Sequence, residues 1–171
     1  ALTVAAVVVI AWQSWNWYQR SQSAQASMVY DVLQKAVYEK DAQRITAASG
    51  ELLEKFGGSD YAALGALTAA KAMVDAGDGK TAKLKLLWVV EHSKHELREL
   101  ARLRLVALLF DEKAYDEALK QLDGKVSPTF AARFAESRGD VLIAQGKRAE
   151  AATVYQAALS DLESADKAGA E

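Results

Sequence analysis

The chain has 171 residues, of which 51% are hydrophobic and 8% aromatic, with one proline, no cysteine and a formal net charge of −2. This composition argues against β-sandwiches and barrels, whose strands are rich in β-branched and aromatic residues and are broken by frequent turns. The lack of cysteine excludes disulfide scaffolds, cysteine-ligated zinc sites and thiol nucleophiles, and the slightly negative charge gives no overall positive field for binding nucleic acid.

The first twenty residues differ in composition from the rest. Residues 1–12 are apolar except for Thr3, and no charged residue precedes Arg20. An aromatic cluster follows, made of Trp12, Trp15, Trp17 and Tyr18. Tryptophan and tyrosine collect where hydrocarbon meets water, so residues 1–20 are predicted to be the end of a transmembrane anchor with an interfacial belt. Twelve helical residues span about 18 Å of a layer about 30 Å thick, which indicates that the start of the anchor is missing.

Two alternatives to the anchor are a signal peptide whose hydrophobic region was retained and a buried core helix. A signal peptide normally ends in small residues, whereas this apolar run ends in tryptophans. Arg20, the one charge that flanks the run, favours the cytoplasm for the rest of the chain.

From residue 21 onward, apolar residues recur three and four positions apart, which predicts helices throughout and no strand. The first two apolar faces contain Val29, Leu33, Ala36 and Val37, and then Ile45, Ala48, Leu52 and Leu53. Residues 57–60 contain a helix stop followed by an N-cap. Further helices are predicted over residues 61–75, 80–92, 94–110, 115–122, 128–145 and 148–162, and residues 164–171 are predicted to be a frayed tail.

A repeat of about 34 residues organises these helices. Ala82, Ala118 and Ala151 each come just after a turn, 36 and 33 residues apart, which is close to the tetratricopeptide period. The same register places Gly139 where the two helices of one pair come closest. Residues 21–163 are therefore predicted to form an all-α, tetratricopeptide-like solenoid of antiparallel helix pairs, with an unrelated helical bundle as the alternative.

The repeats are divergent. Arg102 and Arg138 stand where the repeat pattern is usually apolar. The densest basic patch, Arg98, Arg102 and Arg104, alternates with acidic residues such as Glu99, so we expect a mutually paired, solvated face.

No set of residues with catalytic spacing is present. His92 and His95, three residues apart among glutamates, could hold a metal ion, but a polar turn between helices explains them better because no third ligand follows at helical spacing. Residues 77–81 resemble a phosphate-binding loop, but they lack its leading glycine and a preceding strand. The chain is therefore predicted to be non-enzymatic, without a cofactor or metal site.

A helical repeat array offers a concave surface lined by the first helix of each pair. The predicted protein-binding residues on that surface are Leu64, Leu67, Lys71, Leu103, Arg104, Phe110, Arg133, Glu136 and Asp140. Mixed apolar and charged side chains suit an extended peptide or a partner helix. In the alternative interpretation, Phe110 only covers the core at a helix end.

The sequence resembles the YfgM-type ancillary subunits of the bacterial Sec translocon, from the tryptophan-rich end to Leu159. The resemblance is strongest in residues 103–105 and 115–123, and from Arg138-Gly139-Asp140 through Gly146 to Ala151. It implies a single-pass inner-membrane protein with a cytoplasmic N-terminus and a periplasmic domain, an orientation that overrides the argument from Arg20. Set against that family pattern, the sequence as given is expected to lack the short cytoplasmic segment and the first part of the anchor.

The resemblance also implies partners: the Sec translocon, a membrane-anchored periplasmic chaperone of prolyl-isomerase type, and secreted polypeptides as they emerge. The function predicted is thus a membrane-tethered protein-interaction module. A scaffold for another envelope assembly, such as cytochrome maturation or outer-membrane biogenesis, is the alternative, and a histidine-based enzyme or metal protein is a third possibility.

Overall fold

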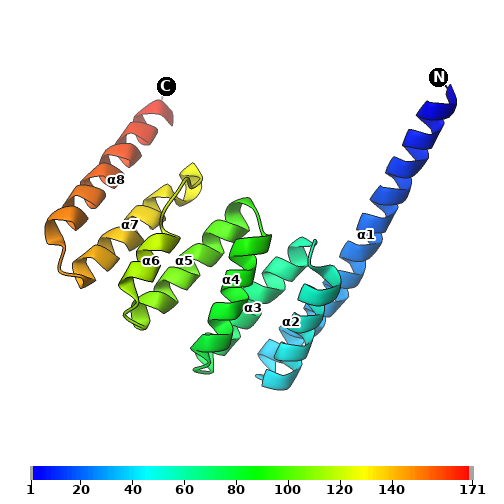
Figure 1. Cartoon of the computed structure of the whole chain (residues 1–171), viewed down its shortest axis with the longest axis horizontal. Helices are drawn as coiled ribbons and strands as arrows, with labels where there is room; N and C mark the ends of the chain where they lie inside the picture. The colour runs from blue at the N-terminus through cyan, green and yellow to red at the C-terminus, as the bar shows by residue number, and fades with distance from the viewer. Residues whose placement is uncertain (1, 170–171) are drawn as a thin grey trace. The chain divides into compact units, whose positions relative to one another are not determined.

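The computed structural model describes the backbone of residues 2–169 and the side chains of residues 12–160 other than 14, 18 and 19. Residues 2–169 form eight helices and no strand, which confirms the predicted all-α class (Figure 1). The helices are α1 (Leu2–Tyr38), α2 (Ala42–Phe56), α3 (Asp60–Asp75), α4 (Gly79–His92), α5 (His95–Asp111), α6 (Tyr115–Gln121), α7 (Pro128–Ala144) and α8 (Arg148–Gly169).

The predicted helix bounds agree with the structure for α3 to α7 but not for the C-terminal end of α8. Helices α3 to α7 begin and end within one residue of the predicted positions. Helix α8 continues to Gly169, past the predicted end at residue 162 and into the expected tail. Residues 163–168 contain glutamate, alanine and lysine, which favour a helix, and neither glycine nor proline interrupts them.

The chain divides into two compact units, Ala1–Asp78 (unit 1) and Gly79–Glu171 (unit 2). The helix pair expected from residues 61–75 and 80–92 is divided between these units. The repeat register can therefore be followed inside unit 2, in the pairs α5–α6 and α7–α8.

In unit 1, helix α1 packs against α2 and α3, and α2 packs against α3. Asp41 caps α2, because its carboxylate accepts hydrogen bonds from the backbone nitrogens of the next turn, and Ser59 caps α3 as the sequence predicts. Leu33 and Leu52 are fully buried between the helices. A β-carbon on Gly65 would lie 2.4 Å from Leu52 Cδ1, so a larger residue there would force the buried Leu52 side chain to move.

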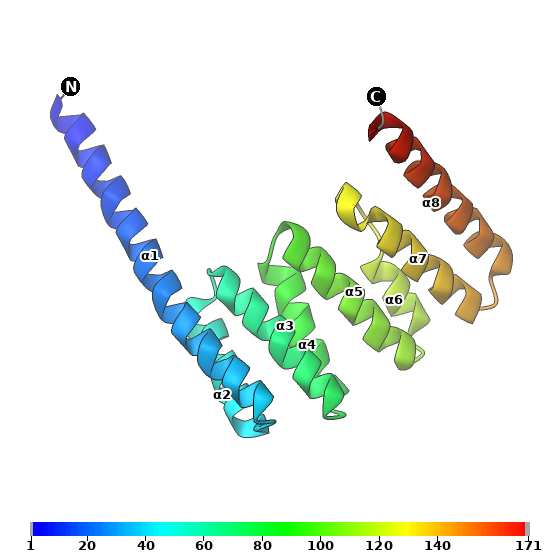
Figure 2. The same cartoon turned by 180° about the vertical axis from the view of Figure 1, so that it is seen from behind.

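Helix α1 runs without a break from Leu2 to Tyr38, and its N-terminal part extends beyond α2 and α3 (Figure 2). Trp12, Trp15 and Trp17 on this part are 65%, 63% and 73% exposed. The side chains of residues 1–11 and of Tyr18, on which the anchor prediction also depends, lie outside the described part. Among the described residues, no helix combines the length and the apolar character needed to span a bilayer.

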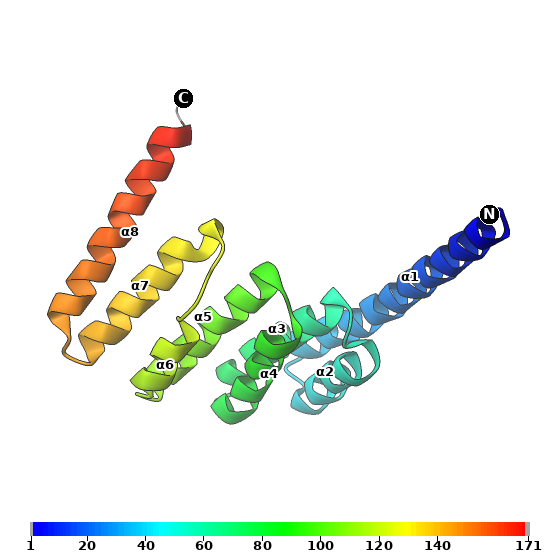
Figure 3. The ribbon, with the colours of Figure 1, turned by 45° about the horizontal axis from the view of Figure 1, so that its top comes forward.

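In unit 2, successive helices run in opposite directions and each packs on the next (Figure 3). Helix α5 also packs on α7, so the first helices of consecutive pairs are neighbours, as tetratricopeptide pairing requires. The three alanines that define the period, Ala82, Ala118 and Ala151, are all buried, with at most 1% exposed. The large buried side chains of this core are Leu86, Val89, Leu105, Leu109 and Val141.

Candidate functional site

Helix α7 is positioned by a buried carboxylate on α5. Glu99 is only 8% exposed and accepts hydrogen bonds from the backbone nitrogen and the hydroxyl of Ser127, at 2.6 Å and 2.5 Å. Ser127 is the residue that precedes the first turn of α7, where a negative charge is favourable. The expectation that Glu99 belongs to a solvated, paired face is therefore wrong, because Glu99 is buried against the start of α7.

The two arginines that depart from the repeat pattern hold the connection between α6 and α7. Arg102 Nε donates to the Gln121 carbonyl oxygen at 2.7 Å, and a second guanidinium nitrogen donates to the Asp123 carbonyl oxygen. The guanidinium carbon also lies 4.7 Å from the centre of the Phe134 ring, a cation–π distance. Arg138 pairs with the Asp123 carboxylate at 2.7 Å. Burial lowers the pKa of Arg102 from its ordinary value, although the group stays charged.

Gly139 lies where α7 and α8 come together, as the repeat register predicts. A β-carbon on Gly139 would lie 2.2 Å from Cε1 of Tyr155, so the tyrosine ring occupies the space that another residue would need. The Tyr155 hydroxyl donates to Asp140 Oδ1 at 2.7 Å. This hydrogen bond raises the pKa of Tyr155 to about 12. The contact confirms the predicted close approach of this helix pair.

A groove between α5 and α7, here called the α5–α7 groove, contains three of the predicted protein-binding residues. It encloses about 210 Å³. Its lining residues are Leu103, Val106, Ala107, Phe110 and Asp111 of α5, with Ser137, Asp140 and Val141 of α7. Val106 and Val141 are buried and form the floor, whereas Asp111 and Asp140 are exposed at the rim.

Phe110 covers a helix end and is also one of the residues that line the α5–α7 groove. Its ring makes an edge contact with Tyr115, with centroids 5.6 Å apart and planes inclined by 62°, so it covers the start of α6. It also lines the α5–α7 groove and remains half-buried rather than fully enclosed. A ring that is held in place by a neighbour and still partly accessible can contact a partner at little cost in conformational entropy.

The remaining predicted residues of unit 2 lie outside the groove lining. Arg133 and Glu136 are exposed on α7. Arg104 on α5 is half-buried, and burial lowers its pKa, so it is not the freely solvated residue that the sequence suggested.

In unit 1, the three predicted residues of α3 differ in exposure. Leu67 is only 3% exposed, so its assignment to a binding surface is wrong: it lies on the face of α3 that forms the core. Lys71 is exposed and pairs with Asp75 at 2.8 Å, and Leu64 is half-buried.

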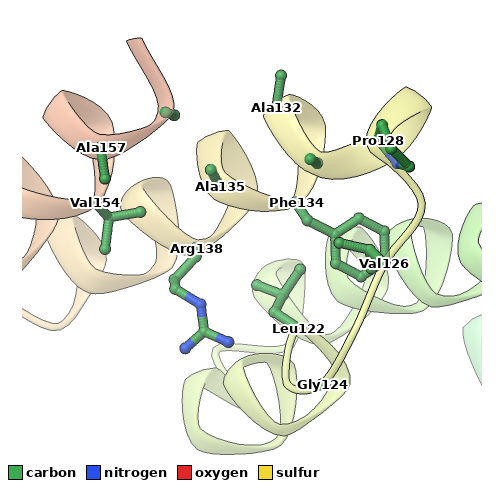
Figure 4. A pocket seen from close by; sticks show the side chains of 12 residues that line it. Leu122, Gly124, Val126, Pro128, Ala132, Phe134, Ala135, Arg138, Val154 and Ala157 are labelled. Atoms are coloured by element: carbon green, nitrogen blue, oxygen red, sulfur yellow. The ribbon is translucent and has the colours of Figure 1, made fainter. Parts of the chain in front are cut away.

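A second, larger groove lies between α7, α8 and the α6–α7 connection, and the sequence analysis missed it. Its volume is about 480 Å³. Figure 4 shows Val154 and Ala157 of α8 facing Ala135 and Arg138 of α7, with Leu122 and Phe134 beside the connection. Its lining includes Ala131, Ala132, Ala135, Ala157 and Ala158. These alanines could have indicated the groove from the sequence, because small side chains on facing helices leave space between the helices.

The α5–α7 groove also contains α5 residues that were not among the predicted binding residues, and the spacing of these residues could have indicated them. Residues 103, 106, 107, 110 and 111 are spaced three and four apart and share one helix face, so Val106, Ala107 and Asp111 follow once Leu103 is placed on the surface.

Of the two histidines that the sequence singles out, His92 makes a stacking contact within its own helix. The His92 ring stacks on Trp88 with centroids 4.5 Å apart, and His92 Nδ1 lies 2.9 Å from the Trp88 carbonyl oxygen. Within the described part of the chain, no three His, Cys, Asp or Glu side chains come together as a metal site would require.

Comparison with known proteins places this fold in a family. Residues 1–170 match the family model described as "Tetratricopeptide repeat-like domain". The chain is 33% identical over 163 residues to the ancillary SecYEG translocon subunit of Neisseria gonorrhoeae, which covers 94% of this chain and 78% of that protein. It is 31% identical to the Escherichia coli protein of the same name, over 87% of this chain and 72% of that protein. The Haemophilus influenzae protein of that name is 30% identical over 88% of this chain and 74% of its own length. The chain therefore belongs to the tetratricopeptide repeat-like family that includes the proteins named ancillary SecYEG translocon subunit.

Proposed function

We propose that the chain is a non-enzymatic, membrane-tethered protein-interaction module of the Sec translocon. The observation that carries this proposal is the similarity to three proteins named for that translocon, each 30–33% identical over most of both chains. Helical repeats that offer grooves and exposed mixed surfaces support an interaction role. We further propose a bacterial inner-membrane location with the repeat domain in the periplasm, where it assists a prolyl-isomerase-type chaperone with emerging secreted proteins.

Helix α1 supplies the proposed tether. The exposed Trp12, Trp15 and Trp17 would lie at the membrane–water interface, with residues 1–20 as the end of the anchor and residues 21–163 as the repeat domain. Tethering raises the effective concentration of the domain near the translocon, so modest affinity for each partner suffices.

The proposed partner surface of unit 2 comprises the α5–α7 groove and the adjoining charges. Leu103, Phe110 and Asp140 line the groove, and Arg104, Arg133 and Glu136 adjoin it on α5 and α7. Leu64 and Lys71 form a separate proposed contact on unit 1.

Affinity capture of the full chain from native membranes, after crosslinking, tests the translocon assignment. We expect SecYEG subunits to be captured together with a periplasmic prolyl isomerase. Capture of cytochrome-maturation or outer-membrane assembly proteins in their place would support the alternative scaffold and end the translocon assignment.

A charge variant tests the surface within the same experiment. Arg133→Glu with Arg104→Gln should weaken capture; glutamine is chosen because a glutamate at the half-buried position 104 would place a carboxylate out of water. Lys120→Glu with Lys94→Gln changes the net charge equally at exposed positions and serves as the control. Equal capture by both variants would move the binding surface away from α5 and α7.

Tryptophan fluorescence tests the tether. A Trp88→Phe variant leaves Trp12, Trp15 and Trp17 as the emitting residues. In phospholipid vesicles, a quencher attached near the headgroups should quench this emission more than a quencher near the bilayer centre. Emission unaffected by either quencher would rule out the interfacial belt.

A further inference from the structure

The α5–α7 groove combines an apolar floor with a rim of one charge sign. Of its eight lining residues, the only two that carry charge, Asp111 and Asp140, are both acidic. The neighbouring acids Glu112 and Glu117 are already paired with Lys83, at 3.3 Å and 3.4 Å. Asp111 and Asp140 are therefore the charges that the groove itself offers to a partner.

The position of Asp140 is fixed by its neighbour. The Tyr155 hydroxyl donates to Asp140 Oδ1 at 2.7 Å, and the Tyr155 ring is wedged over Gly139. A carboxylate that is already oriented loses little entropy when it binds a cation, and a hydrogen bond to a charged group is stronger than one between neutral groups.

The size of the groove restricts what can enter it. A volume of about 210 Å³ lies below the range of roughly 300–1,000 Å³ that is usual for cofactor and small-molecule sites. It suits a single large apolar side chain, which would rest on Val106 and Val141 beside the Phe110 ring. The rest of the occupant must then lie across the rim, next to the two aspartates.

We propose that the α5–α7 groove binds extended polypeptide segments in which a large apolar side chain is adjacent to a lysine or arginine. The apolar side chain enters the groove, and the cation pairs with Asp111 and Asp140. The proposal rests on the proposed role of this surface in binding polypeptides and names the chemistry that it selects. The exposed Arg133 and the half-buried Arg104 lie outside the groove lining, so the charged residues of the lining itself are both acidic.

Fluorescence anisotropy with three labelled ten-residue peptides tests the proposal on the full chain. The first peptide contains two Leu–Lys pairs separated by serines, the second has glutamate in place of each lysine, and the third has serine in place of each leucine. We expect the Leu–Lys peptide to bind more tightly than either of the others at low ionic strength, and its advantage over the Leu–Glu peptide to shrink as salt screens the charges.

Two variants locate the binding site. Asp111→Asn with Asp140→Asn keeps an acceptor for Tyr155 and should weaken Leu–Lys binding on the order of tenfold, as expected for two lost ion pairs at a partly exposed site. Asp31→Asn with Glu54→Gln, at exposed positions of unit 1, changes the net charge equally and should leave binding unchanged. Ala107→Phe, which fills the groove from its rim, should abolish binding of the Leu–Lys peptide.

Several outcomes would overturn the proposal. These are preference for the Leu–Glu peptide, equal binding of all three peptides, binding of none, or loss of Leu–Lys binding in both double variants alike. Self-association that Ala107→Phe disrupts in sedimentation would assign the groove to a second copy of the chain. Capture of SecYEG subunits from membranes does not depend on these peptides, so the translocon assignment can stand even if this proposal fails.

Discussion

The contact between Gly139 and Tyr155 leaves no space for a β-carbon, which makes it a sensitive position in unit 2. Replacing Gly139 with leucine should overpack the α7–α8 contact and lower the free energy of unfolding by about 1–3 kcal/mol. Urea denaturation followed by circular dichroism measures this difference. An unchanged midpoint would mean that Tyr155 moves aside freely and that the contact is not a constraint.

Gly50 provides the matched control for this substitution. It lies inside α2, and a β-carbon added there would meet no atom within 4 Å, so Gly50→Ala should raise the free energy of unfolding by about 0.4–1 kcal/mol. Tyr155→Ala in the Gly139→Leu background should restore part of the lost stability, because it removes the ring that the leucine meets.

The hydrogen bond from Tyr155 to Asp140 predicts a dependence of stability on alkaline pH. It raises the pKa of Tyr155 from 10.0 to about 12, so folding favours the protonated phenol. The stabilisation is complete below pH 10 and is lost as pH rises toward 12. Between these values the free energy of unfolding should fall more steeply for the parent than for Tyr155→Phe. Identical slopes in urea titrations across this window would show that the hydrogen bond does not persist in solution.

At the scale of elements, the start of α7 depends on a single side chain of α5. Glu99 is buried, and each of its two carboxylate oxygens accepts one hydrogen bond from Ser127. Glutamine has a single acceptor oxygen and no negative charge, so it cannot make both hydrogen bonds in the same way. Glu99→Gln should therefore lower the free energy of unfolding by about 1–3 kcal/mol. Glu96→Gln, an exposed position one turn earlier, should change it by less than about 0.5 kcal/mol. Equal effects of the two substitutions in thermal unfolding would contradict the assigned role of Glu99.

Arg102 and Arg138 give a physical reason for two departures from the repeat pattern. In a regular repeat these positions are apolar and pack against the next helix. Here α6 is short, ending at Gln121, and the connection to α7 leaves backbone carbonyls that need donors. Arg102 donates to these carbonyls and also covers the Phe134 ring, and Arg138 pairs with the Asp123 carboxylate in the same connection. No apolar residue offers these contacts.

For the whole molecule, repeat packing predicts that a destabilising substitution lowers stability mainly in the helices around it. Each helix pair contacts only its neighbours along the array, so stability is close to a sum of local terms. Gly139→Leu should therefore speed amide hydrogen exchange in α7 and α8 far more than in α2 and α3 of unit 1. Mass-spectrometric exchange on the full chain can resolve these helices. Uniform acceleration would show that the two units unfold as one.

The sequence by itself determined the bounds of α3 to α7 and the pairing of the helices in unit 2. The bounds of α3 to α7, the Ser59 cap and the close approach at Gly139 follow from apolar spacing, turn residues and small residues at a fixed period. These are local signals, because each depends on residues within one or two helical turns or on a pattern that recurs at a fixed period along the chain.

Only the tertiary structure decided which side chains are buried and which line a groove. Glu99 looked like a surface residue because its partner, Ser127, is 28 positions away and has no recognisable spacing from it. Leu67 looked like a surface residue because the face of α3 that meets α1 and α2 depends on how three helices pack together. The α5–α7 groove likewise exists only where two helices that are distant in sequence lie side by side. Burial and concavity are properties of such long-range packing, which the period of a single helix does not specify.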